Sequence, residues 1–423
     1  MKIGYWLANA SIDGGGVAPY AWRVLELLLT TSKTQEIEVC ILCSIEIEND
    51  CLELIHKYGA NAKLHLIPQF NVEWLLFFSS IKIDLLHVPY QIAPYYDLPC
   101  PIVITMHDVQ ELHYPEFFTP QERSARANYY WEALAKSSAV IVSFDHVKQD
   151  LVKYFSIDES KIHVCPLPYQ NIQLKQPDHE EILQIQSKYS RWSNFLLYPA
   201  QSWQHKNHLS LIKAIEYAKQ NLNVSLSLIG TGKKNPRFFP VIEDYLSKSQ
   251  VCEQVYFTDI VTETELYWLY KNCSLVVIPT LYEAGSFPLL EAMSLDVPVI
   301  CSSVTSLPET IGDTRFIFNP LDVTQMSNLI VDITRNSGLC ANNIENSKHR
   351  INQLKQINSI DAFIQMYEFA VSNSRTSADI LLKQTQSQLQ QTQDEVKSIK
   401  SGKLWKLRIQ WLKLKKMINI FIE

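Results

Sequence analysis

Two glutamates eight residues apart, Glu283 and Glu291, flank a Gly-Ser-Phe-Pro turn in the stretch LYEAGSFPLLEAM. The apolar run SLVVIP before it predicts a buried strand, and Pro288 predicts the first turn of a helix. Backbone N–H groups from about Gly285 to Leu289 would then form an anion site at the helix N-terminus. Carboxylates beside such amides suit a ligand that carries both hydroxyls and phosphates. Two solvated acids are the plain alternative, so the other loops must decide.

A glycine-rich loop follows the first predicted strand. Gly14, Gly15 and Gly16 precede a helix expected near Pro19, and they let the backbone come close to a ligand. The spacing is not G-x-G-x-x-G, so a dinucleotide fingerprint is excluded and a simple glycine turn stays possible.

Two more predicted strands are followed by residues that could take part in binding or catalysis. In ITMHDVQ, His107 and Asp108 come just past a buried strand, where an imidazole can donate to a sugar hydroxyl or to a developing charge. A structural histidine is the alternative reading. In YPAQSWQHKNH, Lys206 is placed to neutralise a diphosphate.

The elements that must position these loops form a repeating pattern. Short apolar runs alternate with helical patterns, which predicts parallel sheets covered on both faces. Such sheets bind ligands beyond the carboxyl ends of their strands. The runs form two series: KIGYWLA, EVCILCS, LHLIP, DLLHVP, PIVITMHD and AVIVSF, then FLLYPA, VSLSLIG, VYFTD, SLVVIP, VPVICS and RFIFNP. We therefore predict an α/β fold of two tandem doubly wound domains.

Apolar content drops over residues 169–194, which predicts the domain boundary there, with a short helix of its own. From about Thr376 the chain becomes Gln-rich and then basic. Six basic residues against one acid over residues 403–423 give +5, and apolar residues recur three and four apart, as on one helical face. This segment is of a kind that binds an anionic membrane surface; packing on its own chain or on a second copy is the alternative.

Bulk composition narrows the class of protein. A length of 423 residues with 47% hydrophobic and 19% charged residues is typical of a globular protein with two cores. The net charge of -6 gives no reason to expect a nucleic-acid partner. Nine scattered cysteines predict reduced thiols in the cytoplasm, with Cys40 and Cys43 as core residues. Neither a signal peptide nor a membrane span is expected.

These motifs together resemble those of the retaining GT-B glycosyltransferases, the glycosyl transferases of group 1. LYEAGSFPLLEAM is similar to their E-x7-E motif and HKNH to their lysine-containing donor loop, while GGGVAPYA and TMHD match in order and spacing. The resemblance covers about residues 1–370. It implies two Rossmann-like domains, an acceptor domain over 1–175 and a nucleotide-sugar domain over 190–350. A crossover helix at about 355–373 would complete the first domain, and 376–423 would form a helical tail.

The resemblance also implies roles for single residues. Glu291 would bind the nucleotide ribose, and Glu283 would contact the donor sugar. Lys206 would hold the diphosphate, helped by amides near Gly285, Ser286 and Phe287. His107 would touch the donor sugar from the acceptor side, and Gly15 and Gly16 would border the phosphates.

Two positions depart from the family pattern. Ala200 stands where many members have arginine, so Lys206 must act alone or with another cation such as Arg237. Ser286 stands where many have glycine, with Gly285 one residue earlier.

The implied reaction is transfer of a hexose-type sugar from a nucleotide diphosphate, with retention, to a saccharide or lipid-linked saccharide. Surface-polysaccharide or lipopolysaccharide biosynthesis is the expected setting. We expect no metal and no cofactor beyond the donor, no nucleic-acid partner, and a cytoplasmic location, peripheral on the inner membrane face if the tail binds lipid. Two alternatives remain: a nucleotide-sugar epimerase of the same architecture, and a self-associating scaffold without activity.

Overall fold

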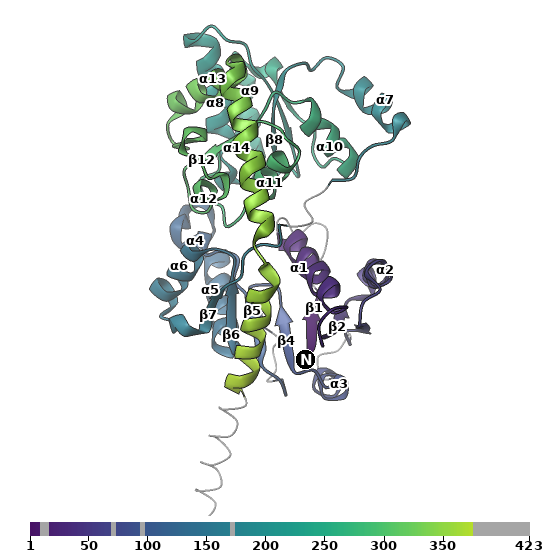
Figure 1. Ribbon diagram of the computed structural model, residues 1–423. Helices are drawn as coiled ribbons and strands as arrows, with labels where there is room; N and C mark the ends of the chain where they lie inside the picture. Colours follow the sequence, from purple (N-terminus) through teal and green to yellow (C-terminus); the bar gives the residue numbers. More distant parts are fainter. Residues whose placement is uncertain (9–16, 69–72, 94–97, 170–173, 375–423) are drawn as a thin grey trace, which may run out of the picture. The chain divides into compact units, whose positions relative to one another are not determined.

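The computed structural model describes residues 1–374, apart from residues 9–16, 69–72, 94–97 and 170–173. The chain divides into two compact units, Met1–Glu368 and Phe369–Glu423. The first unit contains both parallel sheets (Figure 1). The tail predicted for residues 376–423 lies outside the described residues.

The first sheet has seven parallel strands in the order β3-β2-β1-β4-β5-β6-β7. Its central strands are short runs of β-branched and aliphatic residues, and β4, β5 and β6 are buried along their whole length. Such runs need cover on both faces, which is why helices alternate with them. The strands are β1 (Lys2–Trp6), β2 (Glu38–Cys43), β3 (Ala62–Leu66), β4 (Leu85–Val88), β5 (Ile102–Thr105), β6 (Ala139–Val142) and β7 (Ile162–Val164).

The second sheet has six parallel strands in the order β10-β9-β8-β11-β12-β13. Its central strands β8, β11 and β12 are also buried throughout. The strands are β8 (Phe195–Pro199), β9 (Ser227–Thr231), β10 (Val255–Phe257), β11 (Leu275–Ile278), β12 (Val299–Ser302) and β13 (Ile317–Phe318).

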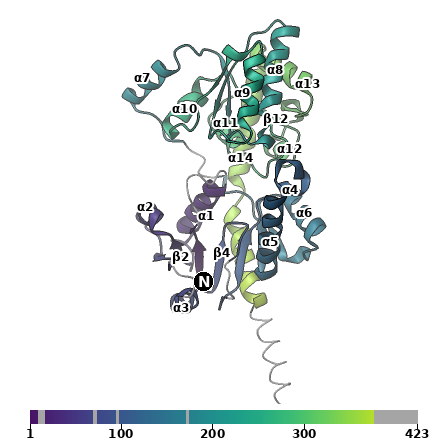
Figure 2. The ribbon, with the colours of Figure 1, turned by 180° about the vertical axis from the view of Figure 1, so that it is seen from behind.

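Helices connect successive strands of each sheet, except that none lies between β4 and β5 within the described residues. Figure 1 shows α1 and α2 beside β1 and β2, and α5 and α6 beside β6 and β7; Figure 2 shows α8 next to α13 from the opposite side. The helices are α1 (Val17–Thr31), α2 (Glu48–Tyr58), α3 (Trp74–Ile81), α4 (Gln110–His113), α5 (Pro120–Lys136), α6 (Asp145–Phe155), α7 (His179–Lys188), α8 (His208–Asn221), α9 (Phe239–Lys248), α10 (Glu263–Asn272), α11 (Phe287–Ser294), α12 (Leu307–Ile311), α13 (Val323–Arg335) and α14 (Ser337–Gln356).

Local sequence signals fix several of these helices. Thr119 and Glu122 form a capping box at the start of α5, with Pro120 at its first position. Asp178 and Glu181 form a second capping box at α7, the short helix expected between the two sheets. Both boxes satisfy N–H groups that have no partner inside the helix.

The strand order places the functional loops. In each sheet the order reverses beside the first strand, between β1 and β4 and between β8 and β11. Loops that leave the carboxyl ends of β8, β11 and β12 therefore meet at one edge of the second sheet. Lys206, Glu283 and Thr305 lie on these three loops.

A helical segment begins at residue 359, after α14 ends at Gln356. Ser359 Oγ donates to the carbonyl of Leu167, and the Tyr367 hydroxyl lies 2.7 Å from Nδ1 of His87 in β4. His87 and Tyr367 are both fully buried. The segment up to residue 368 thus contacts the first sheet. Residues 357–358 are not helical, so the range 355–373, predicted as one helix, is interrupted there.

Candidate active site

An ion pair joins the two charged residues predicted for donor binding. Lys206 ends a 3-10 turn (Gln204–Lys206) after β8, and Glu283 follows β11, the neighbouring strand. Lys206 Nζ lies 2.6 Å from Glu283 Oε2. The side chains are only 20% and 12% exposed, so the pair is largely shielded from water. This shielding strengthens the attraction and makes loss of either partner costly.

The backbone of Glu283 is held by the loop after β12. Its N–H donates to Thr305 Oγ1 at 3.2 Å, and the Thr305 hydroxyl donates in turn to the Glu283 carbonyl. Ser306 Oγ donates to the same carbonyl at 3.2 Å. Thr305 itself has a φ of 47°, a backbone conformation that is uncommon outside glycine. The loop after β12 therefore holds the backbone from which the Glu283 side chain extends.

Burial sets the protonation of Glu283. It raises the pKa of this carboxyl above its usual value, Lys206 partly offsets the rise, and the nearby Asp108 adds to it. The Lys206 ammonium is thus the group that favours the charged carboxylate. Asp108 comes from the loop after β5 of the first sheet, beside His107.

Glu291 lies on α11 and has a different partner. The Tyr270 hydroxyl donates to Glu291 Oε2 at 2.9 Å. Burial raises the pKa of Glu291, and the hydrogen bond from Tyr270 and the charge of Arg23 oppose this rise. The two glutamates are therefore held by separate partners, one by an ammonium and one by a phenol.

The turn between the glutamates resolves the departure at Ser286. Gly285 has a φ of 151°, and Ser286 is the N-cap of α11, with its hydroxyl accepting from the Leu289 amide at 3.4 Å. The Ser286 hydroxyl therefore already accepts from the Leu289 N–H, one of the backbone groups that were expected to face an anion. Phe287 opens the helix, and its ring lies 4.8 Å from the guanidinium carbon of Arg23 on α1.

His107 lies in the loop after β5, packed edge-on against Tyr20 with ring centroids 4.8 Å apart. Its Nε2 is 3.0 Å from the carbonyl of Pro89. A carbonyl only accepts, so Nε2 carries the proton. Burial lowers the pKa of His107, and the neutral ring then offers Nδ1 as an acceptor. The sequence reasoning expected a donating imidazole; this tautomer would instead accept from a hydroxyl.

The remaining predicted positions divide into three groups. Gly15 and Gly16 lie outside the described residues. Ala200 directly follows β8, and its N–H donates to the Thr231 carbonyl at 3.1 Å. Arg237, suggested as a compensating cation, forms a bidentate pair with Glu122 at 2.7 and 3.2 Å on the surface.

Sequence reasoning missed three residues around the glutamates. Tyr270 belongs to the run LYWLY in α10, which reads as ordinary core. Thr305 follows β12 and could have been found by the strand-end rule. Arg23 lies inside α1, and no spacing links it to Glu291.

The described residues also bear on metal binding and on membrane insertion. Within these residues, no group of three or more His, Cys, Asp and Glu side chains could hold a metal ion. Among the same residues, none of the helices combines the length and apolar character that a membrane span requires.

Comparison with known proteins gives the class and then the family. Two family profiles match: Glycosyltransferase Family 4 over residues 15–169 and Glycosyl transferases group 1 over residues 180–350. HepE from Anabaena, solved with UDP and glucose, superimposes with a TM-score of 0.63 at 15% identity, covering 88% of this chain and 100% of HepE. WaaG, a glycosyltransferase involved in lipopolysaccharide biosynthesis, gives 0.61 at 18% identity, covering 86% and 99%.

Curated relatives agree with these matches. The O-antigen chain mannosyltransferase B of Escherichia coli is 25% identical over 225 residues, covering 53% of this chain and 59% of the relative. RfbU, an O-antigen chain mannosyltransferase of Salmonella typhimurium, is 25% identical over 236 residues, covering 54% and 60%. The matched region therefore spans about three fifths of these relatives' length.

The two tandem parallel sheets and these likenesses define a protein of the GT-B class. The chain belongs to the glycosyl transferases of group 1. The predicted fold class and the predicted family are confirmed; retention and the domain boundaries stay predictions.

Proposed function

We propose that this protein is a retaining glycosyltransferase that moves a hexose-type sugar from a nucleotide diphosphate to a saccharide or lipid-linked saccharide. The observation that carries the proposal is the shielded Lys206–Glu283 pair beside the N-terminus of α11. It offers a cation for phosphate and a carboxylate for sugar hydroxyls on neighbouring strands. The mannosyltransferase and O-antigen names of the relatives support a role in surface-polysaccharide or lipopolysaccharide biosynthesis.

The first requirement of the reaction is a stable leaving group. As the bond between the sugar and the diphosphate breaks, negative charge grows on the departing phosphate oxygen. Lys206 and the backbone N–H groups of Ser286 and Phe287, where α11 begins, are the groups that would stabilise this charge, because the helix dipole favours an anion there. Glu291 on the same helix would accept hydrogen bonds from the ribose hydroxyls. No further cofactor and no metal are required by this scheme.

Retention follows if the acceptor attacks from the face that the diphosphate leaves. The acceptor hydroxyl forms the new bond to the anomeric carbon, and its proton passes to the departing phosphate oxygen. Glu283 would position the donor sugar rather than attack it. His107, through the free Nδ1 of its neutral ring, would accept from a hydroxyl of the donor sugar.

The test is a screen of purified full-length protein against common nucleotide sugars, including GDP-mannose and UDP-glucose. Thermal shift reports donor binding, because a bound ligand raises the melting temperature with occupancy. Mass spectrometry with saccharide acceptors reports transfer, and parallel reactions with EDTA test the expected metal independence. Product without an acceptor, as an interconverted nucleotide sugar, would indicate the epimerase alternative. Neither binding nor product with any donor would reject the proposal.

Lys206→Ala tests the role of the ammonium. We expect donor affinity to fall by at least about tenfold, because a charge-assisted contact contributes about 1.5–3 kcal/mol. The nucleoside alone should lose little affinity, since it carries no diphosphate. Equal loss for nucleoside and nucleotide sugar, measured by calorimetry, would show that the variant disrupts the site as a whole.

A further inference from the structure

A cavity whose lining includes neither Glu283 nor Glu291 lies between α1 and α2 of the first sheet. Its volume is about 490 Å³. This is within the range of roughly 300–1,000 Å³ that small-molecule sites occupy. We call it the α1–α2 groove; the residues that line it are Trp22, Glu26, Ile47, Asp50, Glu53, Leu54 and Lys57.

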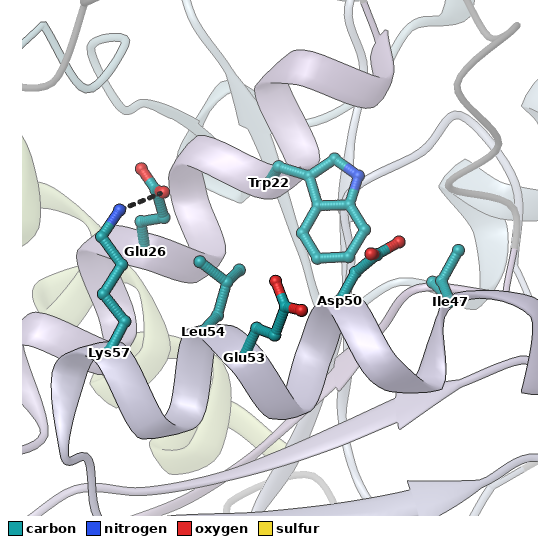
Figure 3. A pocket seen from close by; sticks show the side chains of 7 residues that line it. All are labelled: Trp22, Glu26, Ile47, Asp50, Glu53, Leu54 and Lys57. Carbon is teal, nitrogen blue, oxygen red and sulfur yellow. Dashed lines mark ion pairs between the residues drawn. The ribbon is translucent and has the colours of Figure 1, made fainter. Parts of the chain in front are cut away.

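The side chains of the groove fall into two kinds. Figure 3 shows the indole of Trp22 reaching from α1 over α2, with Asp50 and Glu53 below it and Leu54 alongside. Trp22 is only half-buried, so part of its ring is open to a ligand. The groove therefore combines an aromatic face and an aliphatic floor with carboxylates.

The charges of the groove select against one class of ligand. Three carboxylates face one ammonium, and that ammonium, Lys57 Nζ, lies 3.9 Å from Glu26 at one end. Asp50 and Glu53 form no ion pair within the described part of the chain. An anionic nucleotide, phosphate or lipid headgroup would be repelled here. The proposed donor site differs in that its ammonium, Lys206, lies near the N-terminus of a helix, which favours anions.

A neutral sugar fits both kinds of side chain. The apolar C–H face of a pyranose can pack on an indole ring, as other apolar ligand surfaces do. Hydroxyl groups at its rim can donate to ionised carboxylates, which act only as acceptors. Leu54 and Ile47 can contact the remaining apolar edge.

We propose that the α1–α2 groove binds a neutral saccharide chain. The groove would hold sugar units of the acceptor polymer while its end enters the catalytic site. The identification of the bound saccharide as the acceptor rests on the proposed function. The binding of a saccharide by the groove does not. A growing polymer held at a second point gains effective concentration at the first.

Calorimetric titration of the full chain with α-mannotetraose tests the proposal. Trp22→Ala should weaken binding by about tenfold, as expected for loss of an aromatic anchor of the ligand. The double variant Asp50→Asn with Glu53→Gln, both exposed positions, should weaken binding without affecting folding. Trp131→Ala, on the exposed face of α5, is the matched control and should bind as the wild type does.

Two further measurements separate this proposal from the proposed function. Glu283→Ala should keep mannotetraose binding at the groove even if all transfer is lost. An oligogalacturonate of equal length should not bind, because its carboxylates meet those of the groove. Wild-type affinity in both groove variants, or no binding of mannotetraose by the wild type, would overturn the proposal, whether or not glycosyl transfer is found.

Discussion

Lys206 and Glu283 neutralise each other's charge in their ion pair. A diphosphate that binds Lys206 must share the ammonium with this carboxylate or displace it. The competition has a direct consequence, because the interaction that holds Glu283 in place also reduces the attraction of the site for phosphate. The Glu283 carboxylate should contribute to affinity only for a ligand whose sugar hydroxyls can donate to it.

Glu283→Gln should therefore separate two kinds of binding. We expect transfer to be lost, while affinity for a nucleoside diphosphate without sugar rises several-fold, because Lys206 no longer has a carboxylate partner. Calorimetry with GDP and UDP measures the second effect. Glu180→Gln, an exposed position on α7, is the control and should change neither quantity. Weaker diphosphate binding in Glu283→Gln would contradict the competition.

Glu291 gives a prediction about pH. Burial raises its pKa above the usual value, so the folded protein holds this proton more tightly than the unfolded chain. Its contribution to stability is then greatest at low pH and falls as the pH rises through the raised pKa. At neutral pH the ionised carboxylate destabilises the fold.

Glu291→Gln should remove this penalty. We expect a higher melting temperature than the wild type at pH 7 and little difference near pH 4, because the amide oxygen can still accept from Tyr270. Donor affinity should fall, since an amide accepts ribose hydroxyl hydrogen bonds less strongly than a carboxylate. Thermal melts at both pH values test the sign; a gain confined to low pH would refute it.

At the scale of elements, the turn before α11 depends on Gly285. Its φ of 151° is rarely adopted by other residues. A Cβ there would lie 3.0 Å from Phe144 and 3.2 Å from Leu167. Backbone strain and crowding thus act together at the residue that aims the first amides of α11.

Gly285→Ala should destabilise the protein by about 1 kcal/mol or more. Transfer should fall further than stability accounts for, because the amides at the helix start would move. Gly338→Ala, near the start of α14, has no positive φ and should stay within about 0.5 kcal/mol of the wild type. Chemical denaturation and kcat/KM measure the two effects. If both variants behave alike, the turn does not need glycine.

The same scale shows what the sequence could reveal. Apolar runs such as SLVVIP and FLLYPA predicted strands, and the strand-end rule put Lys206 and Glu283 on loops at one sheet edge. The pairing of their side chains, and of Tyr270 with Glu291, depends on strand register and rotamers, which no local pattern records. Ser286 illustrates the limit, since its capping role follows from where α11 begins.

At the scale of the whole molecule, charge is unevenly divided along the chain. The last 21 residues carry +5, so the rest carries -11 of the total of -6. An anionic membrane would repel the main body and attract this segment, at about 1 kcal/mol for each basic residue near the surface. Binding of residues 376–423 to lipid should therefore depend on salt concentration and on the charge of the lipid.

Deleting residues 376–423 should abolish sedimentation with vesicles that contain phosphatidylglycerol. In the full chain, the variant with Lys413, Lys415 and Lys416 changed to Gln should bind them more weakly, and added salt should weaken wild-type binding, because screening acts on exposed charges. Vesicles of phosphatidylcholine alone are the control. Unchanged sedimentation of the truncated protein would place membrane binding elsewhere. If truncation instead changes only the mass measured by light scattering, the tail serves self-association. A second copy and a lipid surface would compete for the same apolar residues of 403–423.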